Sequence, residues 1–250
     1  MKVLFTICGR AGSKGIRNKN IREFLDKPLP LFTISAIDLF LKNCPEVEAD
    51  IALNTDSEEL ISIVENNGMR KVSIVPRKQA LAGDTVGKLD VIRDTMLEME
   101  QRSGAYDMVI DMDLTSPLRQ DGDLEKVYRE QKTGKWDAVF TVADSRRNPY
   151  FNMVTYVEGE GYKKVIASDF TARQQAPEIF DMNASIYAYA PEFLRNTKSI
   201  FDGKCGIVKM YDTAILDLDH ESDFELMELV ARYLFDNKPD FTAIYSNMGK

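Results

Sequence analysis

A glycine-rich, strongly basic segment directly follows the first apolar run of the chain. Between Ile7 and Ile21 the sequence reads ICGRAGSKGIRNKNI, with two arginines, two lysines and no acidic residue. The whole chain, in contrast, carries a formal charge of -8. Glycines free backbone amides to approach a ligand, and amides with cationic side chains cradle phosphates. Local positive charge on an acidic protein therefore favours capture of a small anion and disfavours binding of nucleic acid.

The glycine spacing of this segment excludes two common phosphate-binding motifs. Gly9 and Gly15 have five residues between them instead of four, and Ile16 follows in place of lysine, so the G-x-x-x-x-G-K-[ST] pattern is absent. Gly9, Gly12 and Gly15 are spaced by three, so the G-x-G-x-x-G pattern of NAD-dependent oxidoreductases is absent as well. What remains is a nucleotidyltransferase loop around a nucleoside triphosphate, or a solvated loop without a ligand.

Two pairs of aspartates are candidates for metal chemistry. Asp217 and Asp219, like Asp111 and Asp113, stand two residues apart in segments that we expect to be strands, which puts both carboxylates of a pair on one face. Carboxylates held that close favour a cation between them, and Mg²⁺ suits oxygen ligands. The three widely spaced cysteines and the single histidine indicate neither a disulfide framework nor a zinc site, and they fit a reducing cytoplasm.

Strand and helix patterns alternate through the first 140 residues. Near-continuous apolar runs followed by segments of helical period predict an α/β fold with a mostly parallel sheet and helices on both faces. Ligands bind such sheets at the carboxyl ends of strands, where the basic loop lies. We expect strands at 2–8, 49–55, 71–76, 106–113 and 136–143, and helices at 30–43, 56–68, 83–104 and 121–134.

The helical period disappears after residue 143. Residues 148–170 read as a β-hairpin with EGEG at its turn, so 144–180 is expected to be an insertion projecting from a single domain of residues 1–250. This hairpin either contacts a second subunit or packs on its own. We then expect a strand at 183–190, a helix at 191–197, a last strand at 213–219 and a helix at 222–235. No apolar run is long enough for a transmembrane helix, and the one at the N-terminus is too short for a signal peptide.

Five segments resemble, in the same order, the signature elements of CMP-sialic acid synthetases (acylneuraminate cytidylyltransferases). They are RAGSKGIRNKNI, VPRKQALAGDT, LTSPLR, ARQQAPEIFDMNASIY and LDLDHESDFELME. The resemblance implies a Rossmann-like nucleotidyltransferase fold. It also implies transfer of CMP from CTP to a nonulosonic α-keto acid sugar with release of pyrophosphate, the cofactor Mg²⁺ or Mn²⁺, and a homodimer with a shared active site.

The resemblance assigns roles to residues that match the family's motifs. Lys14 and Lys19 are expected to grip the triphosphate, and Asp217 with Asp219 to hold the metal, while Lys14, Lys19, Asp217 and Asp113 form the catalytic set. The nucleotide-binding set is Arg10, Ala11, Gly12, Ser13, Asn20, Arg77 and Asp84. The substrate-binding set is Asp113, Ser116, Arg119, Arg173, Gln174, Asn183 and Tyr187. An arginine suits a two-pronged grip on the sugar's carboxylate, and the resemblance places Arg173 in the partner's site.

Some positions depart from the family pattern and leave alternatives open. Asp113 stands where the family commonly has glutamine, so it binds magnesium, accepts a hydroxyl proton or only hydrogen-bonds the sugar. Tyr187 either faces the sugar or belongs to the core. Ala184 replaces a glycine, and Tyr150 with Phe151 makes the sequence look more like relatives acting on legionaminate-type sugars. The acceptor therefore remains open among sialic acid, legionaminate, pseudaminate and KDO, and a non-catalytic nucleotide-sugar-binding protein is the alternative from another class.

Overall fold

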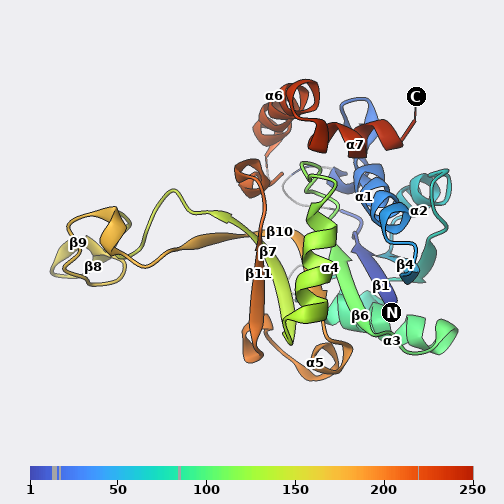
Figure 1. Cartoon of the computed structure of the whole chain (residues 1–250), viewed down its shortest axis with the longest axis horizontal. Coiled ribbons are helices and arrows are strands. Elements are labelled where there is room, and N and C mark those ends of the chain that lie inside the picture. Colours follow the sequence, from blue (N-terminus) through green and yellow to red (C-terminus); the bar gives the residue numbers. More distant parts are fainter. Residues whose placement is uncertain (13–15, 17, 84–85, 219, 250) are drawn as a thin grey trace.

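A seven-stranded sheet forms the centre of the protein in a computed structural model that describes residues 1–12, 16, 18–83, 86–218 and 220–249 (Figure 1). Six strands run parallel and β10 runs antiparallel to both of its neighbours, β6 and β7. The predicted mostly parallel α/β sheet is thereby confirmed. In spatial order the strands are β11 (Cys205–Lys209), β7 (Ala138–Asp144), β10 (Phe180–Tyr189), β6 (Met108–Met112), β1 (Lys2–Cys8), β4 (Glu48–Thr55) and β5 (Ser73–Pro76).

Helices cover both faces of the sheet, as predicted. Alternate side chains of β1 point to opposite faces, so Val3 and Phe5 join one apolar cluster while Leu4 joins the other. The first face carries α1 (Leu29–Asn43), α2 (Glu58–Glu65), α4 (Asp123–Thr133), α6 (Glu221–Asn237) and α7 (Pro239–Asn247). The second face carries α3 (Lys88–Ser103) and α5 (Pro191–Asn196).

The order of the strands reverses at β1. This strand pairs with β4 on one side and with β6 on the other, both in parallel, so its carboxyl end is a topological switch point. The register sets Thr6 of β1 opposite Asp111 of β6. Both residues follow the alternation of Leu4 and Val109 and therefore face α3, which begins at Lys88. Three polar residues from distant parts of the sequence thus meet at this end of the sheet.

The expected strand at 213–219 is wrong. Asp212–Ile215 forms a 3₁₀ turn, and the described residues 216–218 belong to no strand. The edge strand is instead β11, which pairs in parallel with β7 and was not predicted. The strand pattern of β11 is weak in the sequence, because a glycine, Gly206, interrupts it. The Trp136 ring lies against the backbone at this position, and a Cβ atom there would come within 2.6 Å of the ring nitrogen. A strand glycine often marks such a close approach.

A two-stranded hairpin stands apart from the sheet. β8 (Val154–Val157) pairs antiparallel with β9 (Gly161–Lys164), and Figure 1 shows both at the end of a long excursion between β7 and β10. Val154, Tyr156 and Tyr162 are exposed by 63%, 64% and 75%. Within the described part of the chain, no helix is both long and apolar enough to span a membrane.

Candidate active site

The loop after β1 is fastened to the carboxyl end of β4. The backbone N–H of Gly9 donates to the carbonyl of Asn54 at 3.1 Å, and that of Ala11 donates to a carboxylate oxygen of Asp56 at 2.7 Å. The helix expected at 56–68 begins at Glu58 as α2, and Ser57 caps it by accepting from the Leu60 N–H at 3.2 Å. The carboxylate of Asp56 therefore holds the loop.

A cavity of about 320 Å³ lies within this loop, and we name it the loop cavity. It brings together four members of the predicted nucleotide-binding set, Arg10, Ala11, Gly12 and Asn20, and the side-chain amide of Asn20 donates to the Arg10 carbonyl at 3.0 Å. Gly12 has a φ of +69°, a conformation that favours glycine. The remaining lining comes from Asn18, Ile21, Asp56, Ser57, Glu58 and Glu59. Ser13, Lys14 and Asp84 lie outside the described residues.

Arg77 lies beside this cavity on the segment that leaves β5. Its guanidinium donates to the Asn54 side-chain oxygen at 2.9 Å and to the Asn54 carbonyl at 3.2 Å. Burial lowers its pKa, although the charge of Asp56 opposes this. Asn54 also accepts from the Gly9 N–H, so Arg77 helps to fix the residue to which the loop is attached. Among the residues described as lining the cavity, Arg77 is absent.

Lys19 connects the basic loop to the segment before α6. Its ammonium donates to the carbonyl of Leu218 at 2.7 Å. The neighbouring carboxylate of Asp217 is exposed. Burial raises the pKa of the Tyr187 hydroxyl, and the charge of Asp217 adds to this rise while the charge of Lys88 opposes it. The structure therefore brings Lys19, Asp217 and the carboxyl end of the sheet together, although the segment that does so is not a strand.

The predicted metal ligands can be tested only in part. No group of three or more Asp, Glu, His or Cys side chains suited to a metal occurs among the residues that the structure describes, which leave out Asp219. The exposed carboxylate of Asp217 fits a hard cation such as Mg²⁺. Asp111 and Asp113 fit it less well, since both carboxylates already pair with one ammonium group.

That ammonium belongs to Lys88, the first residue of α3. Its Nζ lies 2.8 Å from Asp111 Oδ2 and 2.7 Å from Asp113 Oδ2. The other oxygen of Asp111 accepts from the Thr6 hydroxyl at 2.8 Å, and that of Asp113 accepts from the backbone N–H and the hydroxyl of Thr115 at 2.7 and 2.6 Å. We name Lys88, Asp111 and Asp113 the lysine–aspartate cluster.

Charge pairing offsets burial in this cluster, where the Asp111 side chain is fully buried, that of Asp113 is 18% exposed and that of Lys88 is 39% exposed. Burial opposes the ionised form of Asp113, but Lys88 and Thr115 outweigh it and hold the pKa of this carboxyl well below its usual value. Burial likewise opposes the charge of Lys88, yet the two carboxylates raise the pKa of its ammonium well above the usual value. Two carboxylates and one ammonium leave a formal charge of -1. The group therefore attracts hydrogen-bond donors and repels anions.

A second cavity, of about 290 Å³, opens over Lys88 and Asp111 of this cluster. Lys88 and Asp111 form its polar side, while Met182, Tyr187 and Tyr189 of β10 form much of its apolar side. Tyr187 donates its hydroxyl to the Asn183 carbonyl at 3.0 Å and stacks on Phe140, so its ring is fixed. The rest of the lining comes from Gly87, Leu89, Asp90, Ala184, Lys198 and Ile200. We name it the tyrosine cavity.

Arg119 and Asn183 lie beneath this cavity and are buried. Arg119 is only 2% exposed, and its guanidinium donates to the carbonyls of Asp113 and Ser185 at 2.6 and 3.0 Å. It also donates to the hydroxyls of Ser185 at 2.8 Å and Thr33 at 3.2 Å. Burial lowers its pKa to about 10. The guanidinium that the resemblance placed in the substrate-binding set thus makes its described contacts inside the protein.

Asn183 and Ser116 belong to the same buried layer. The side-chain oxygen of Asn183 accepts from the Thr141 hydroxyl at 2.6 Å and from the Ser185 N–H at 3.1 Å, which fixes the irregular part of β10. Ser116 is 8% exposed and follows Thr115 on the loop that leaves β6. These residues support Asp113 and Tyr187 from below.

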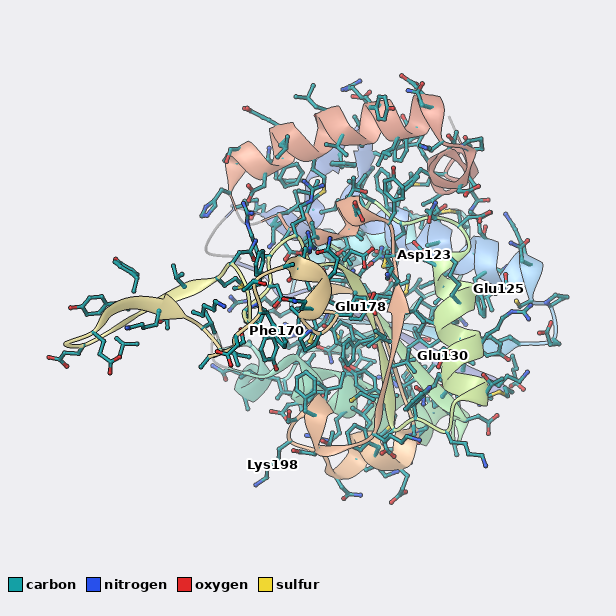
Figure 2. The ribbon with its side chains drawn as sticks, turned by 60° about the vertical axis from the view of Figure 1, so that its left-hand side comes forward. Asp123, Glu125, Glu130, Phe170, Glu178 and Lys198 are labelled. Carbon is teal, nitrogen blue, oxygen red and sulfur yellow. The ribbon has the colours of Figure 1, made fainter. Side chains whose placement is uncertain are left out.

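Arg173 and Gln174 line a third cavity, of about 520 Å³, at the base of the hairpin. Arg173 donates to the carbonyl of Ser145 at 2.6 Å. Figure 2 shows Phe170 and Glu178 near this base, and Glu178 is also part of the lining. Arg173 and Tyr187 line different cavities, and the described linings of the two share no residue.

Lys88 is the site residue that sequence reasoning missed. Its partners Asp111 and Asp113 were singled out, but the cation between them comes from 23 and 25 residues earlier in the chain. The available signal was its place in the sequence, three residues after the LAGDT element and in the first turns of the helix expected at 83–104, which follows a strand. Thr6 and Thr115 were missed as well, because threonines in strands and turns are common.

Comparison with known proteins agrees with this geometry. A family model described as "Cytidylyltransferase" matches residues 4–235. The "Post-translational flagellin modification protein B" of Campylobacter coli is 35% identical over 232 residues, which cover 92% of this chain and 95% of the relative. The "CMP-N,N'-diacetyllegionaminic acid synthase" of Campylobacter jejuni is 34% identical over 230 residues, which cover 92% of this chain and 94% of the relative.

A solved structure supports the same fold. The structure of CMP:2-keto-3-deoxy-manno-octonic acid synthetase complexed with CTP matches with a TM-score of 0.65 and covers 93% of this chain and 99% of its own. Its sequence identity of 13% shows the fold alone. The family model and the two Campylobacter relatives, which span nearly the whole chain, confirm the resemblance seen in the motifs. The chain belongs to the cytidylyltransferase family.

Proposed function

We propose that this protein transfers CMP from CTP to a nonulosonic acid, a sialic-acid-like α-keto acid sugar, and releases pyrophosphate. The observation that carries the proposal is the 34% identity, over 92% of the chain, to a CMP-N,N'-diacetyllegionaminic acid synthase. A hydroxyl oxygen of the sugar forms a bond to the α-phosphorus of CTP. The bond from that phosphorus to the bridging oxygen breaks, pyrophosphate leaves with the electron pair, and the hydroxyl proton passes to water.

The nucleotide side of this reaction is assigned to the basic loop. Arg10, Asn20 and the amides around Gly12 line the loop cavity, which supports contact with the phosphates. Lys14 and Lys19 are proposed to neutralise the charge that grows on departing pyrophosphate. The acidic residues on the same cavity, Asp56 among them, would repel a bare triphosphate. Cationic groups and a metal are therefore needed for binding.

The metal is proposed to be Mg²⁺ or Mn²⁺, held by Asp217 and Asp219. Asp217 is an exposed carboxylate on the residue before Leu218, whose carbonyl accepts from Lys19. When bound, such an ion supplies positive charge to the phosphate oxygens. Lys19 itself would orient the segment that bears these aspartates, since its ammonium holds the Leu218 carbonyl.

The acceptor sugar is assigned to the tyrosine cavity and Asp113. A general base works best with a pKa near the working pH, whereas the pKa of Asp113 is held well below its usual value. We therefore assign Asp113 the part of a hydrogen-bond acceptor that orients the sugar. Arg119 is assigned a positioning role, because it holds the Asp113 carbonyl and two groups of Ser185.

A homodimer is proposed to complete the site. The hairpin insertion exposes Val154, Tyr156 and Tyr162, an apolar surface suited to a second copy of the chain. Arg173 and Gln174 lie at its base and would then reach the partner's tyrosine cavity. The domain is proposed to be a single unit carrying this insertion. All three cysteines are free thiols, which supports the cytoplasm as the compartment.

The first experiment measures pyrophosphate release with CTP and Mg²⁺ against N-acetylneuraminate, KDN, legionaminate, pseudaminate and KDO. Lys19→Ala and Asp217→Ala are expected to lower the rate at least a hundredfold, whereas Lys27→Ala and Asp212→Ala, which change charges away from the loop cavity, should keep it. KDO belongs in the panel because the solved structure with a matching fold is a synthetase for that sugar. CTP binding without release for any sugar would favour a non-catalytic nucleotide-sugar-binding protein.

A further inference from the structure

Lys88 is a charged residue, paired with two aspartates and 39% exposed, that the proposed reaction has not yet used. We propose that Lys88 is the positioning residue of the acceptor site: its ammonium holds Asp113 so that this carboxylate accepts a hydrogen bond from a neutral donor group of the sugar, a hydroxyl or an acylamino N–H. This inference rests on the proposed function and identifies Lys88 as a residue that determines which acceptor sugar is selected.

The first argument is geometric. An ammonium has three donors, and Lys88 directs it at two carboxylate oxygens 2.7 and 2.8 Å away. Thr115 fixes the other oxygen of Asp113 with two hydrogen bonds. The Asp113 carboxylate is thus held at both oxygens, yet its side chain remains 18% exposed. An oxygen has room for two donors, so Oδ2 can accept one more from a ligand.

The second argument is electrostatic. Two carboxylates this close favour protonation of one of them unless a cation lies between. Lys88 supplies that cation from within the chain, with its ammonium 2.8 Å from Asp111 and 2.7 Å from Asp113. The formal charge of -1 on the lysine–aspartate cluster attracts a donor group, and it repels the carboxylate of the sugar. The cluster therefore also orients the acceptor sugar, because the carboxylate of the sugar is directed away from Asp113.

The third argument concerns the surroundings. Lys88 lines the tyrosine cavity together with Met182, Tyr187 and Tyr189. Apolar and aromatic walls next to a few fixed polar groups are typical of small-molecule sites. The aromatic side would take the apolar part of the sugar's substituent, such as an acyl methyl group, while its polar hydrogen reaches Asp113. No residue described as lining the loop cavity also lines this one, so the effect of Lys88 should fall on the acceptor and spare CTP.

The test compares Lys88→Met with Lys88→Arg and with Lys126→Met, a matched control. Lys126 on α4 also pairs with a buried aspartate, Asp123, at 3.1 Å, but it lines none of the described cavities. With the sugar that the wild-type protein uses, Lys88→Met is expected to raise the acceptor KM at least tenfold while the KM for CTP changes less than twofold. Lys88→Arg should recover part of the loss, and Lys126→Met should behave like the wild type.

A second variant covers the case in which Lys88→Met does not fold. Lys88→Met combined with Asp111→Asn removes one of the two carboxylates that would be left buried without a cation, and the same rise in acceptor KM is expected. An unchanged acceptor KM in a folded variant, or a parallel rise for CTP, overturns the inference. A wild-type protein that turns over none of the sugars instead contradicts the proposed function and takes this inference with it.

Discussion

The carboxyl end of the sheet and the projecting hairpin distribute polar and apolar side chains in opposite ways. At the sheet, Asp111 is fully buried and Arg119 is 2% exposed. On the hairpin, Tyr156 and Tyr162 are exposed by 64% and 75%, although aromatic side chains contribute most when buried. The first region buries charged groups that prefer water. The second exposes aromatic groups that prefer an apolar environment.

The contrast indicates what each region is for. Burying a charge is costly unless partners surround it, and every charge at the sheet has them: Lys88 for the two aspartates, and four oxygen acceptors for Arg119. Such a region can hold a ligand without rearranging. In the described chain, the strands of the hairpin pair only with each other, so its apolar side chains are available to another molecule.

Replacing Arg119 with alanine should have the largest effect. The change removes four hydrogen bonds from a charged guanidinium to buried oxygens, worth about 1.5–3 kcal/mol each, although the carbonyls of Asp113 and Ser185 keep the Thr33 hydroxyl and the Asp113 N–H as donors. We expect the free energy of unfolding, measured with urea, to fall by more than ~3 kcal/mol. Arg129→Ala is the control, since its side chain is 71% exposed and pairs with Glu125, a contact worth less than about 1 kcal/mol. Equal losses would show that the buried layer is not what holds the site.

Acid stability should depend on Asp113. Because its pKa is lower in the folded than in the unfolded protein, the unfolded state binds more protons at acid pH. Its contribution is complete above about pH 4 and is lost as the pH falls further. Between pH 4 and pH 3 the wild type should therefore lose up to about 1.4 kcal/mol more stability than Asp113→Asn.

The measurement is urea unfolding at pH 7, 4 and 3. Asp236→Asn, which changes an exposed carboxylate of α6, should follow the wild type at each pH. If Asp113→Asn instead loses stability with pH as steeply as the wild type does, Lys88 does not stabilise the ionised carboxylate in the way that its 2.7 Å contact indicates.

Much of the carboxyl end of the sheet could be predicted from the sequence, because the patterns that mark it involve neighbouring residues. The basic glycine segment marked the loop after β1, and the spacing of Asp111 and Asp113 marked the end of β6. Short-range patterns report on strand alternation and turn chemistry, and both depend on neighbouring residues. The mostly parallel sheet and the family followed from the same patterns.

The remainder depended on contacts between distant segments. The ammonium of Lys88 reaches Asp111 from α3, and no periodicity in the sequence indicates that contact. Arg119 matched a motif whose residues often face a ligand, but only its four internal acceptors reveal that it is buried. The apolar residues of 213–218 alternate like a strand, yet β11 takes the edge of the sheet and leaves that segment as a turn. Tertiary packing overrides local preference in such places.

The hairpin should give the smallest change in stability and a distinct change in assembly. Tyr156 and Tyr162 form an edge-to-face pair with centroids 5.6 Å apart, and replacing both with serine should lower the free energy of unfolding by at most about 1.5 kcal/mol. If this surface joins two chains, sedimentation should show the dimer dissociating at concentrations at least tenfold higher than for the wild type. Tyr233→Ser, which changes a tyrosine 62% exposed on α6, should leave assembly unaltered. Weaker assembly in Tyr233→Ser alone would move the interface to α6 and remove the hairpin from the proposed shared site.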